Sequence, residues 1–310
     1  MMMQKSNEKL VSIIIPTHNG SKVIRNAVNS VLNQTYTKFE IIVVDDNGIG
    51  TKEQINTKQQ IADLIKLGKV KYITHKVCKN GAAARNTGFR FSKGEYITLL
   101  DDDDEYLKNK IYDQVNLFEK LDSKYGLVYC GAFVMNDCNR LRINRDTGDV
   151  FFRLLIHDLV IGSDCLMVRR ECWSSLNGFN ESFVRHQDFE FTARVAAQWK
   201  IKALNVAGVV FHELKRHEPK DKSIMFKNRV HYLKSMLPLM NIFNIKRVRM
   251  IVSINLIQLV GNELRSLKLF EAFKLCEAGF NSILDNYSIK DFFSAIVYVI
   301  YMKTKSRLNV

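Results

Sequence analysis

The sequence of 310 residues has few of the residues that interrupt or cross-link a chain. It contains only three prolines, so no proline-rich linker divides it. Its six cysteines show neither CxxC nor zinc-ligand spacing, which excludes short-range cysteine motifs and predicts reduced thiols in a cytosolic setting. No internal repeat or low-complexity segment is present. These absences favour an ordinary globular protein with one large domain and an appendage.

Long hydrophobic runs are also missing. The first ten residues contain no apolar signal region, so we do not expect secretion. The longest apolar run near the end, Phe292 to Met302, has 11 residues, whereas about 20 are needed to span a bilayer. The sequence therefore predicts a cytoplasmic protein, with at most a peripheral place on the inner face of the cell membrane.

Positive charge exceeds negative charge, with a formal net charge of +14. Residues 221–310 carry 14 Lys and Arg against six Asp and Glu, so this segment alone contributes +8. Such a balance favours an anionic partner. No nucleic-acid-binding motif is visible, so we do not expect nucleic acid as that partner. Two interpretations of 221–310 stay open, namely helices that pack on the main domain and a basic surface that lies on an anionic membrane.

Buried strands alternate with helices over the first two thirds of the chain. Continuous apolar runs such as 11–15 and 39–44 are typical of strands buried on both faces of a sheet. The alternation predicts βαβ units and an α/β, Rossmann-like, mainly parallel sheet flanked by helices. The expected strands are 11–15, 39–44, 70–74, 95–100, 127–134, 165–168 and 206–211, and the expected helices are 21–33, 51–67, 82–91, 107–121, 170–176 and 188–199.

The stretch from Glu95 to Glu105 is the most unusual in the sequence. An apolar strand leads directly into four consecutive aspartates, Asp101 to Asp104. Their carboxylates repel one another, and a hard divalent cation would offset that repulsion. Ligands in open α/β sheets bind beyond the carboxyl ends of strands, where these residues lie. The simpler alternative is an acidic turn in which an aspartate caps a helix that begins near Tyr106.

Five motifs resemble those of the inverting family 2 glycosyltransferases of GT-A fold, of the type found in bacterial surface-polysaccharide synthesis. They follow one another in the family's order over residues 10–212 and read VSIIIPTHNG, FEIIVVDDNG, GAAARNTGF, GEYITLLDDDDEY and GFNESFVRHQDFEF. The resemblance implies a GT-A domain over 1–220, with a nucleotide-sugar half at about 1–104 and an acceptor half at about 105–220. Residues 221–310, a basic helical C-terminal extension, lie outside it.

The resemblance implies a donor pocket at the ends of the first strands. Asp46 would accept the imino hydrogen of the base. The family often has an aromatic residue where His18 stands. Arg85 would lie beside the nucleotide, or would form a structural ion pair with Asp46 or Asp102. The residues expected to bind the nucleotide sugar are Pro16, Thr17, His18, Asn19, Asp46, Arg85, Asp101 and Asp102.

The resemblance also implies a metal site for Mn²⁺ or Mg²⁺. Asp101 to Asp103 match the D-x-D motif, with Asp103 as the direct metal ligand and Asp101 or Asp102 serving the ribose or a metal-bound water. His212 is a further candidate ligand, with His217 as its alternative. A cation that bridges the diphosphate would stabilise the negative charge that grows on this leaving group.

The catalytic base implied by the resemblance is Asp188. It would take the proton of the acceptor hydroxyl as the hydroxyl attacks the anomeric carbon. Gln187 stands where the family often has Glu. On the residues alone, Asp188 could equally be an acid at the start of a helix. By position, Gly162 to Asp164 and Trp173 would border the acceptor pocket.

The sequence thus predicts a glycosyltransferase of hexosyltransferase type. It would move a sugar from a nucleoside-diphosphate sugar, with UDP as the expected nucleotide, to a hydroxyl of a saccharide or lipid-linked saccharide. The alternatives are a nucleotidyltransferase-like enzyme and a non-catalytic membrane-binding protein with a degenerate GT-A domain. The first would need a basic residue in a glycine-rich phosphate loop, of which THNGSK is a poor version.

Overall fold

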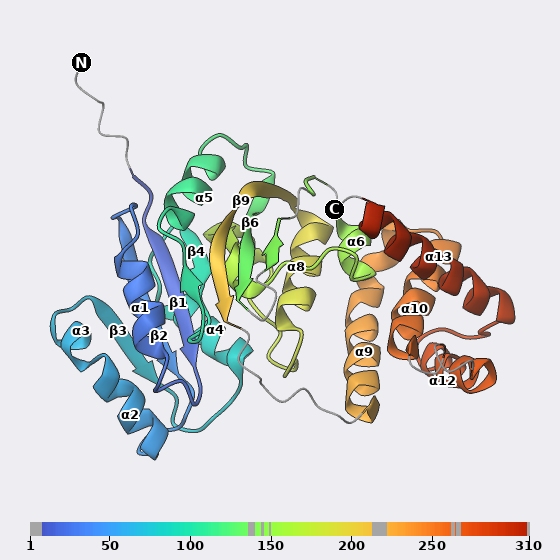
Figure 1. Ribbon diagram of the computed structural model, residues 1–310, viewed down its shortest axis with the longest axis horizontal. Coiled ribbons are helices and arrows are strands. Elements are labelled where there is room, and N and C mark those ends of the chain that lie inside the picture. The colour runs from blue at the N-terminus through green and yellow to red at the C-terminus, as the bar shows by residue number, and fades with distance from the viewer. Residues whose placement is uncertain are drawn as a thin grey trace. The chain divides into compact units, whose positions relative to one another are not determined.

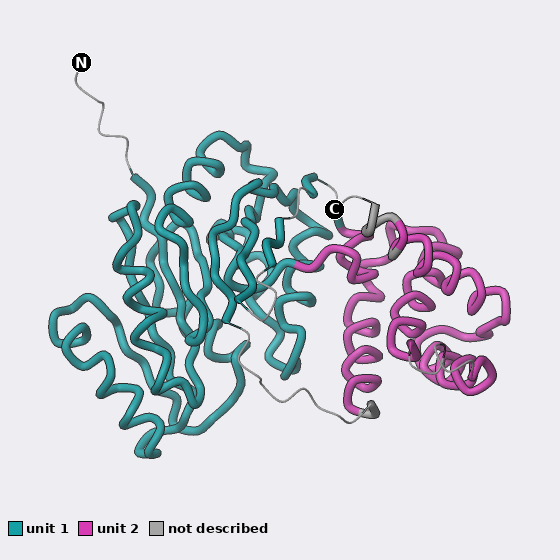
Figure 2. Tube along the Cα trace, viewed as in Figure 1, with its two compact units in different colours: residues 1–150, 161–216 teal, residues 151–160, 217–310 magenta. Residues whose placement is uncertain are grey.

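The computed structural model describes residues 8–135, 140–143, 146–148, 150–212, 222–261, 264 and 268–308. The chain divides into two compact units (Figure 2). Unit 1 comprises residues 1–150 and 161–216, and unit 2 comprises residues 151–160 and 217–310. Residues 151–160 therefore belong with the C-terminal helices, although they precede part of unit 1 in the sequence.

Unit 1 is built on a nine-stranded sheet (Figure 1). Its strand order is β3-β2-β1-β4-β8-β6-β9-β5, and β7 pairs with β6. The pairs β3–β2, β2–β1, β1–β4 and β6–β9 are parallel and include the longest ladders, while the others are antiparallel. The strands are β1 (Val11–Thr17), β2 (Phe39–Asp45), β3 (Val70–Thr74), β4 (Tyr96–Leu99), β5 (Glu105–Tyr106), β6 (Tyr125–Met135), β7 (Arg140–Arg142), β8 (Leu166–Arg169) and β9 (Lys200–His212).

Helices flank this sheet because the central strands are apolar on both faces. Every residue of β1 is buried, and α4 packs on β1 and β2 while α5 packs on β6 and β9. The α/β sheet with flanking helices confirms the predicted fold class. The helices of unit 1 are α1 (Ile24–Leu32), α2 (Lys52–Gln60), α3 (Ala62–Lys66), α4 (Gly81–Phe91), α5 (Lys110–Phe118), α7 (Arg170–Ser175) and α8 (Gln187–Gln198), with the 3-10 helix η1 (Ser163–Cys165).

Two local predictions were wrong. The helix expected over 51–67 is two helices, because the backbone of Ile61 leaves helical geometry between α2 and α3. The helix expected near Tyr106 does not begin there, because Glu105 and Tyr106 form β5 against β9 and α5 begins at Lys110. Asp104 therefore caps no helix. An antiparallel partner from about 100 residues further along the chain overrides the local helical pattern.

Unit 2 is helical. Its helices are α6 (Phe151–Leu155), α9 (Lys222–Met236), η2 (Leu237–Ile242), α10 (Ile245–Leu259), α12 (Leu269–Asn281) and α13 (Ile289–Leu308). The core helix is α10, which packs against α9, α12 and α13. Its buried Asn255 donates from Nδ2 to the carbonyl of Leu155 over 2.9 Å, which ties α10 to α6.

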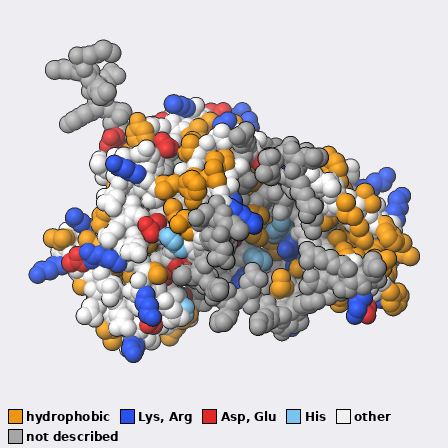
Figure 3. Space-filling model, viewed as in Figure 1, with side chains coloured by type: hydrophobic (Ala, Val, Ile, Leu, Met, Phe, Trp, Pro, Cys, Tyr) orange, Lys and Arg blue, Asp and Glu red, His pale blue; other side chains and the backbone are white. Residues whose placement is uncertain are grey.

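The surface of unit 2 is partly apolar. On α13, side chains at helical spacing point to solvent, including Phe293, Val297 and Ile300. Figure 3 shows hydrophobic side chains gathered over the C-terminal helices, with Lys and Arg side chains nearby. Among the described helices, none is both long and apolar enough to cross a bilayer.

Candidate active site

The four aspartates that follow β4 have different partners. Asp101 accepts from Nη2 of Arg85 over 2.6 Å. Asp102 is buried and accepts from the Thr17 hydroxyl over 2.6 Å. Asp104 is buried and accepts from the backbone N–H of His212 over 2.9 Å. The four aspartates are identical in sequence, but the neighbouring elements give each described carboxylate a different partner.

A second acid lies beside this run. Asp164 in η1 is fully buried, and its Oδ1 accepts from the backbone N–H of Asp101 over 3.1 Å. With both carboxylates ionised its buried Oδ2 accepts from none of the described groups, whereas a proton on one of them allows a hydrogen bond between Asp164 and Asp104. Burial, together with the neighbouring carboxylates of Asp101 and Asp104, raises the pKa of Asp164 well above its ordinary range. Burial likewise raises the pKa of Asp104 to about 6.

These carboxylates form an all-oxygen donor set. One oxygen each of Asp101, Asp104 and Asp164 lies within 4.8 Å of the others. Mg²⁺ and Mn²⁺ prefer oxygen ligands, and a cation would offset the negative charge of these carboxylates and give the buried Oδ2 of Asp164 a partner. The residues at the end of β4 therefore fit a hard divalent cation.

The predicted ligands Asp103 and His212 lie outside this donor set. Asp103 is half-buried next to it in sequence. The ring Nε2 of His212 lies 3.0 Å from Oε1 of Glu105, so this histidine stands at the same edge of the sheet. The metal roles of Asp103 and His212 stay predictions. His217 lies outside the described residues.

Arg85 on α4 connects two acidic elements of the site. It donates from Nη2 to Asp101 and from Nη1 to Oε1 of Gln187 over 2.8 Å. Burial alone would lower the pKa of Arg85, but the carboxylates of Asp101, Asp164 and Asp188 outweigh burial and raise it above its usual value. The sequence left two roles for Arg85, a contact with the nucleotide and a structural ion pair with Asp46 or Asp102. Arg85 does form an ion pair, but its partner is Asp101.

Asp188 lies in the first turn of α8. Its Oδ1 accepts from the N–H of Phe189 over 3.1 Å, and the residue before α8, His186, adopts a left-handed conformation with φ of 57°. Burial, with a smaller contribution from Asp101, raises the pKa of Asp188 to about 6 against the opposing charge of Arg85. A carboxylate with such a pKa is mostly ionised at neutral pH and still accepts a proton readily.

Asp46 follows β2 and is held from several sides. Its Oδ1 lies 2.6 Å from Nδ1 of His75 and accepts from the backbone N–H of Lys79 over 2.9 Å. The other ring nitrogen of His75 lies 2.9 Å from the Thr87 hydroxyl. His18 reaches the backbone carbonyl of Asp46 with Nδ1 at 3.2 Å. The carboxylate of Asp46 is therefore fixed in one orientation.

Asp45 has a structural role despite its position next to Asp46. It is fully buried and accepts from the backbone and side-chain amides of Asn47 and from the Tyr72 hydroxyl. Asn47 in turn accepts from the backbone N–H of Asn19 over 2.8 Å. These bonds hold the loop after β1 against the loop after β2.

All the predicted donor residues except Asn19 line a cavity of about 140 Å³. Drug-sized ligands occupy pockets of roughly 300 Å³ or more, so this cavity can enclose only part of a nucleotide sugar. A larger cavity of about 400 Å³ lies among Lys9, Glu95 and Arg169, away from the aspartates. The smaller cavity is lined by Pro16, Thr17, His18, Asp46, Gly81, Ala84, Arg85, Asp101 and Asp102.

Sequence reasoning missed His75, whose only signal is its place after β3, beside the acidic end of β2. It also placed Trp173 at an acceptor pocket, and this is wrong. Trp173 is 1% exposed and packs among Phe89, Phe179 and Phe191, with its ring centroid 5.2 Å from that of Phe89. Ser163, by contrast, does lie at the site, since its hydroxyl is 3.5 Å from Oδ2 of Asp101.

Residues 12–173 match the model of the family described as glycosyl transferase family 2. Among curated proteins, an uncharacterized glycosyltransferase of Rickettsia typhi is 32% identical over 240 residues, which cover 74% of this chain and 67% of that protein. The UDP-Glc:alpha-D-GlcNAc-diphosphoundecaprenol beta-1,3-glucosyltransferase WfgD of Escherichia coli is 27% identical over 64% of this chain and 74% of its own.

Solved structures share the fold. The TarS 1–349 structure of S. aureus in complex with UDP-GlcNAc has a TM-score of 0.66 at 15% identity, covering 88% of this chain and 81% of its own. The mannosyltransferase PcManGT of Pyrobaculum calidifontis, in complex with GDP-Man and Mn²⁺, has a TM-score of 0.55 at 16% identity, covering 96% and 79%. At these identities the likeness concerns the fold.

Proposed function

Because this chain belongs to glycosyl transferase family 2, we propose that it transfers a sugar from a UDP-sugar to an acceptor hydroxyl in the synthesis of a polysaccharide or glycolipid. The proposal includes a metal-dependent single displacement that inverts the anomeric centre. The observation that carries it is the convergence of Asp188 and the carboxylates after β4 on the guanidinium of Arg85. A proton acceptor and a metal-binding set of oxygens are thereby held at one edge of the sheet.

The donor nucleotide would lie at the ends of β1 and β2. The fixed orientation of Asp46 suits it to accept the imino hydrogen of a uracil, and Asp102, held by the buried bond from Thr17, would lie near the ribose. UDP is favoured because the named donor of WfgD is UDP-Glc and the TarS structure contains UDP-GlcNAc. The GDP-Man in PcManGT makes guanine the base to test against it.

Mn²⁺ or Mg²⁺ would be held by carboxylates of the run Asp101 to Asp104, with Asp103 as a direct ligand and Asp164 behind the run. When bound, the cation supplies positive charge to the departing diphosphate. The residues of the chain orient this site, because Arg85 fixes Asp101 and the backbone of His212 fixes Asp104.

Asp188 would accept the proton of the acceptor hydroxyl. Its raised pKa of about 6 makes it a better proton acceptor than an exposed aspartate, and at neutral pH most of it is ionised. Attack from the side opposite the diphosphate would convert an α-linked donor into a β-linked product. The acceptor class we favour is a lipid-linked saccharide, because the name of WfgD specifies one.

Unit 2 would place the enzyme at the surface of an anionic membrane. The outward face of α13 combines apolar side chains, including Val297 with 66% exposure, with the exposed Lys290. The excess of positive charge in 221–310 complements acidic lipid headgroups. This arrangement would bring the site that binds the soluble donor to a lipid-linked acceptor.

One experiment tests the transfer. The purified protein is incubated with UDP-, GDP- and dTDP-sugars and Mn²⁺, with a lipid-diphosphate-linked saccharide as acceptor, while diphosphate release and product mass are measured. We expect release with a UDP-sugar, loss of release in Asp103→Ala, and retained UDP binding without transfer in Asp188→Asn. Asp285→Asn removes an exposed acid of unit 2 and is the control. Release that is unchanged in Asp103→Ala and Asp188→Asn would refute the assigned site.

A second experiment tests the membrane surface. We expect the protein to float with vesicles that contain acidic phospholipid, and to detach at high salt. Val297→Glu should abolish flotation. Ile55→Glu is a matched control, because Ile55 on α2 is similarly exposed, at 55%, but belongs to unit 1. Equal flotation of both variants would contradict a role for α13.

A further inference from the structure

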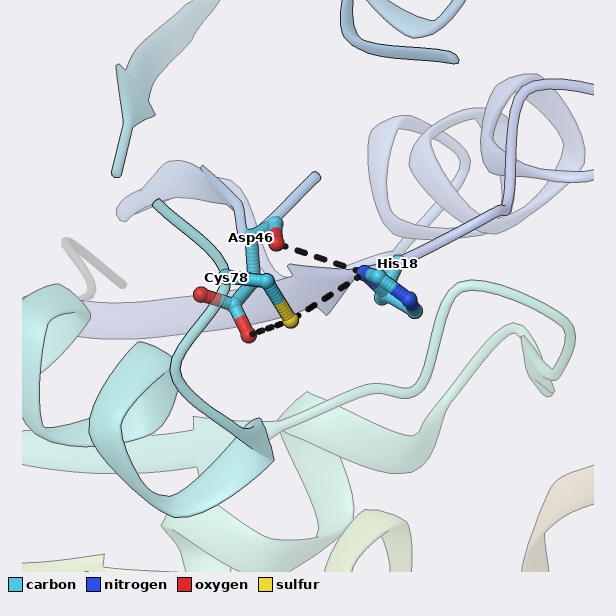
Figure 4. Close-up of side chains that lie close together, drawn as sticks. All are labelled: His18, Asp46 and Cys78. Carbon is cyan, nitrogen blue, oxygen red and sulfur yellow. Dashed lines mark hydrogen bonds between the residues drawn. The ribbon is translucent and has the colours of Figure 1, made fainter. Parts of the chain in front are cut away.

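Three side chains from three separate loops converge beside the cavity. His18 follows β1, Asp46 follows β2, and Cys78 precedes α4. Figure 4 shows the sulfur of Cys78 between the ring of His18 and the carboxylate of Asp46. One ligand atom of each residue lies within 4.8 Å of the others. Unlike the carboxylates after β4, this group offers one nitrogen, one oxygen and one sulfur.

The spacing of these atoms matches the edges of a tetrahedral zinc site. The Cys78 sulfur lies 3.7 Å from Nδ1 of His18 and 3.5 Å from Oδ2 of Asp46. Bond lengths of about 2.3 Å to sulfur and 2.0–2.2 Å to nitrogen or oxygen place such ligand atoms about 3.5–3.7 Å apart around tetrahedral Zn²⁺. Two of the three ligand-to-ligand distances therefore already fit, and the ligand atoms of His18 and Asp46 lie within 4.8 Å of each other.

The surroundings of Asp46 resemble the outer shell of a metal site. Its Oδ1 is occupied by His75 and by the backbone N–H of Lys79, which leaves Oδ2 directed at the sulfur. His75 is fixed in turn by the Thr87 hydroxyl. Hydrogen-bonded carboxylates of this kind orient metal ligands and strengthen binding. In the metal-free protein Nδ1 of His18 donates to the backbone carbonyl of Asp46 over 3.2 Å, so metal binding would replace this bond and move the ring proton to Nε2.

We propose that His18, Asp46 and Cys78 bind a thiophilic divalent cation, best Zn²⁺, with the fourth position open, and that this ion excludes the donor nucleotide. The exclusion rests on the proposed function, because His18 and Asp46 are the residues expected to receive the base. The ion differs from the one expected near Asp103, since thiolate and imidazole select zinc whereas carboxylates alone select Mg²⁺ or Mn²⁺. Zinc would thereby inhibit an enzyme that manganese activates.

Binding would exchange the thiol proton of Cys78 for the metal. The sulfur–hydrogen bond breaks, the sulfur lone pair forms the zinc–sulfur bond, and the proton passes to solvent. Burial and the neighbouring Asp46 raise the pKa of this thiol, so the proton is still present at neutral pH. The apparent zinc affinity should therefore fall about tenfold for each unit by which the pH is lowered below neutrality, through this proton alone.

The site can be tested without turnover. The full, untagged chain is titrated with Co²⁺ as a spectroscopic substitute, and Zn²⁺ is then added to displace it. We expect a thiolate-to-cobalt charge-transfer band with about one equivalent of metal. Cys78→Ser should abolish the band, and Asp103→Asn should retain it. A thiol that only donates a hydrogen bond to Asp46 would give no band, and this outcome would overturn the proposal.

The exclusion is tested by titrating UDP into the wild-type protein and Cys78→Ser, each with and without Zn²⁺. We expect zinc to raise the apparent Kd for UDP at least tenfold in the wild type and to leave it unchanged in Cys78→Ser. An equal zinc effect in both proteins would overturn the exclusion. A protein that shows the cobalt band but binds no UDP even without zinc would support the metal site and contradict the proposed function.

Discussion

Arg85 donates to Asp101 over 2.6 Å, and through its other terminal nitrogen it donates to Gln187 over 2.8 Å. One guanidinium therefore connects α4, the end of β4 and the start of α8. Its planar fork fixes the angle between the two acceptors, and a lysine ammonium cannot reproduce that angle. The position of Asp188, next to Gln187, thus depends on a residue just over one hundred positions earlier in the chain.

Arg85→Lys should keep one contact and lose the other. A lysine at this position can pair with Asp101 but cannot also reach Gln187 in the same geometry. Hydrogen bonds to charged groups contribute about 1.5–3 kcal/mol, so we expect kcat/KM to fall at least tenfold. Steady-state kinetics with varied donor would measure the loss.

Arg25→Lys is the matched control for this variant. Arg25 also contacts an aspartate, Asp63, through two nitrogens, but on the exposed surface. Exposed pairs contribute little, so we expect kcat/KM and Tm close to those of the wild type. Equal kinetics in Arg85→Lys and the wild type would show that the fork does not position Asp188.

The sequence predicts the parts of this protein that depend on local pattern. Apolar runs such as 11–15 and 39–44 predict buried strands, because a strand covered on both faces does not alternate between apolar and polar residues. Asn80 before Gly81 marks the start of α4, and its side chain does cap the N–H of Ala83. The acidic ends of β2 and β4 could also be expected to share one sheet edge, since both strands are parallel neighbours of β1.

The remainder depends on contacts between distant residues. Asp104 resembles a helix cap in sequence, yet it lies directly before β5, where the backbone of His212 on β9 binds its carboxylate. Trp173 lies near acceptor residues in sequence, yet three phenylalanines enclose it. His75 has no motif of its own, and only the pairing of β3 with β2 brings it to Asp46. The spacing of Cys78, His18 and Asp46 in the sequence does not predict that they lie close together.

Asp188→Asn should lose activity and gain stability at neutral pH. The pKa of Asp188 is raised to about 6 on folding, so the folded protein binds this proton more tightly than the unfolded chain. Its ionisation above pH 6 therefore opposes folding. Asparagine removes that ionisation, and we expect a gain on the order of 1–3 kcal/mol at pH 7.5 that disappears near pH 4. Thermal unfolding at the two pH values would measure it.

The same pKa determines where the kcat/KM of the wild type begins to fall as the pH is lowered. Asp188 accepts a proton only when ionised, so kcat/KM should fall tenfold per pH unit below about 6. A rate that stays level down to pH 5 would contradict Asp188 as the base. A loss of stability in Asp188→Asn at pH 7.5 would instead contradict the burial that raises its pKa.

Gln187→Glu tests why a neutral amide stands beside the base. A carboxylate here would accept from Arg85 as the amide does, but it would add a negative charge next to Asp188. Like charge disfavours ionisation, so the acid limb of kcat/KM should move to higher pH. Gln187→Leu is the uncharged control and should lower the rate without moving the limb. If the pH at which kcat/KM falls is the same in Gln187→Glu and the wild type, Arg85 neutralises the added charge.

Gly20→Ala should disturb the donor site from outside it. A methyl group at Gly20 would overlap both Oδ2 of Asp102 and the hydroxyl of Thr17, the two atoms that share a buried hydrogen bond. Asp102 would have to turn away and leave that bond, and overpacking of this kind costs about 1–3 kcal/mol. We therefore expect a lower Tm and weaker UDP binding, measured by thermal unfolding and calorimetry.

Gly261→Ala separates the overlap from the general effect of replacing glycine. A methyl group at Gly261 meets nothing within 4 Å, and the residue is helical. Alanine is compatible with helical backbone and meets no neighbour here, so this variant should be about as stable as the wild type, with UDP binding unchanged. If Gly20→Ala loses stability but binds UDP normally, Asp102 packs against Gly20 without touching the donor. If it loses UDP affinity as well, the carboxylate that Gly20 accommodates is part of the donor site.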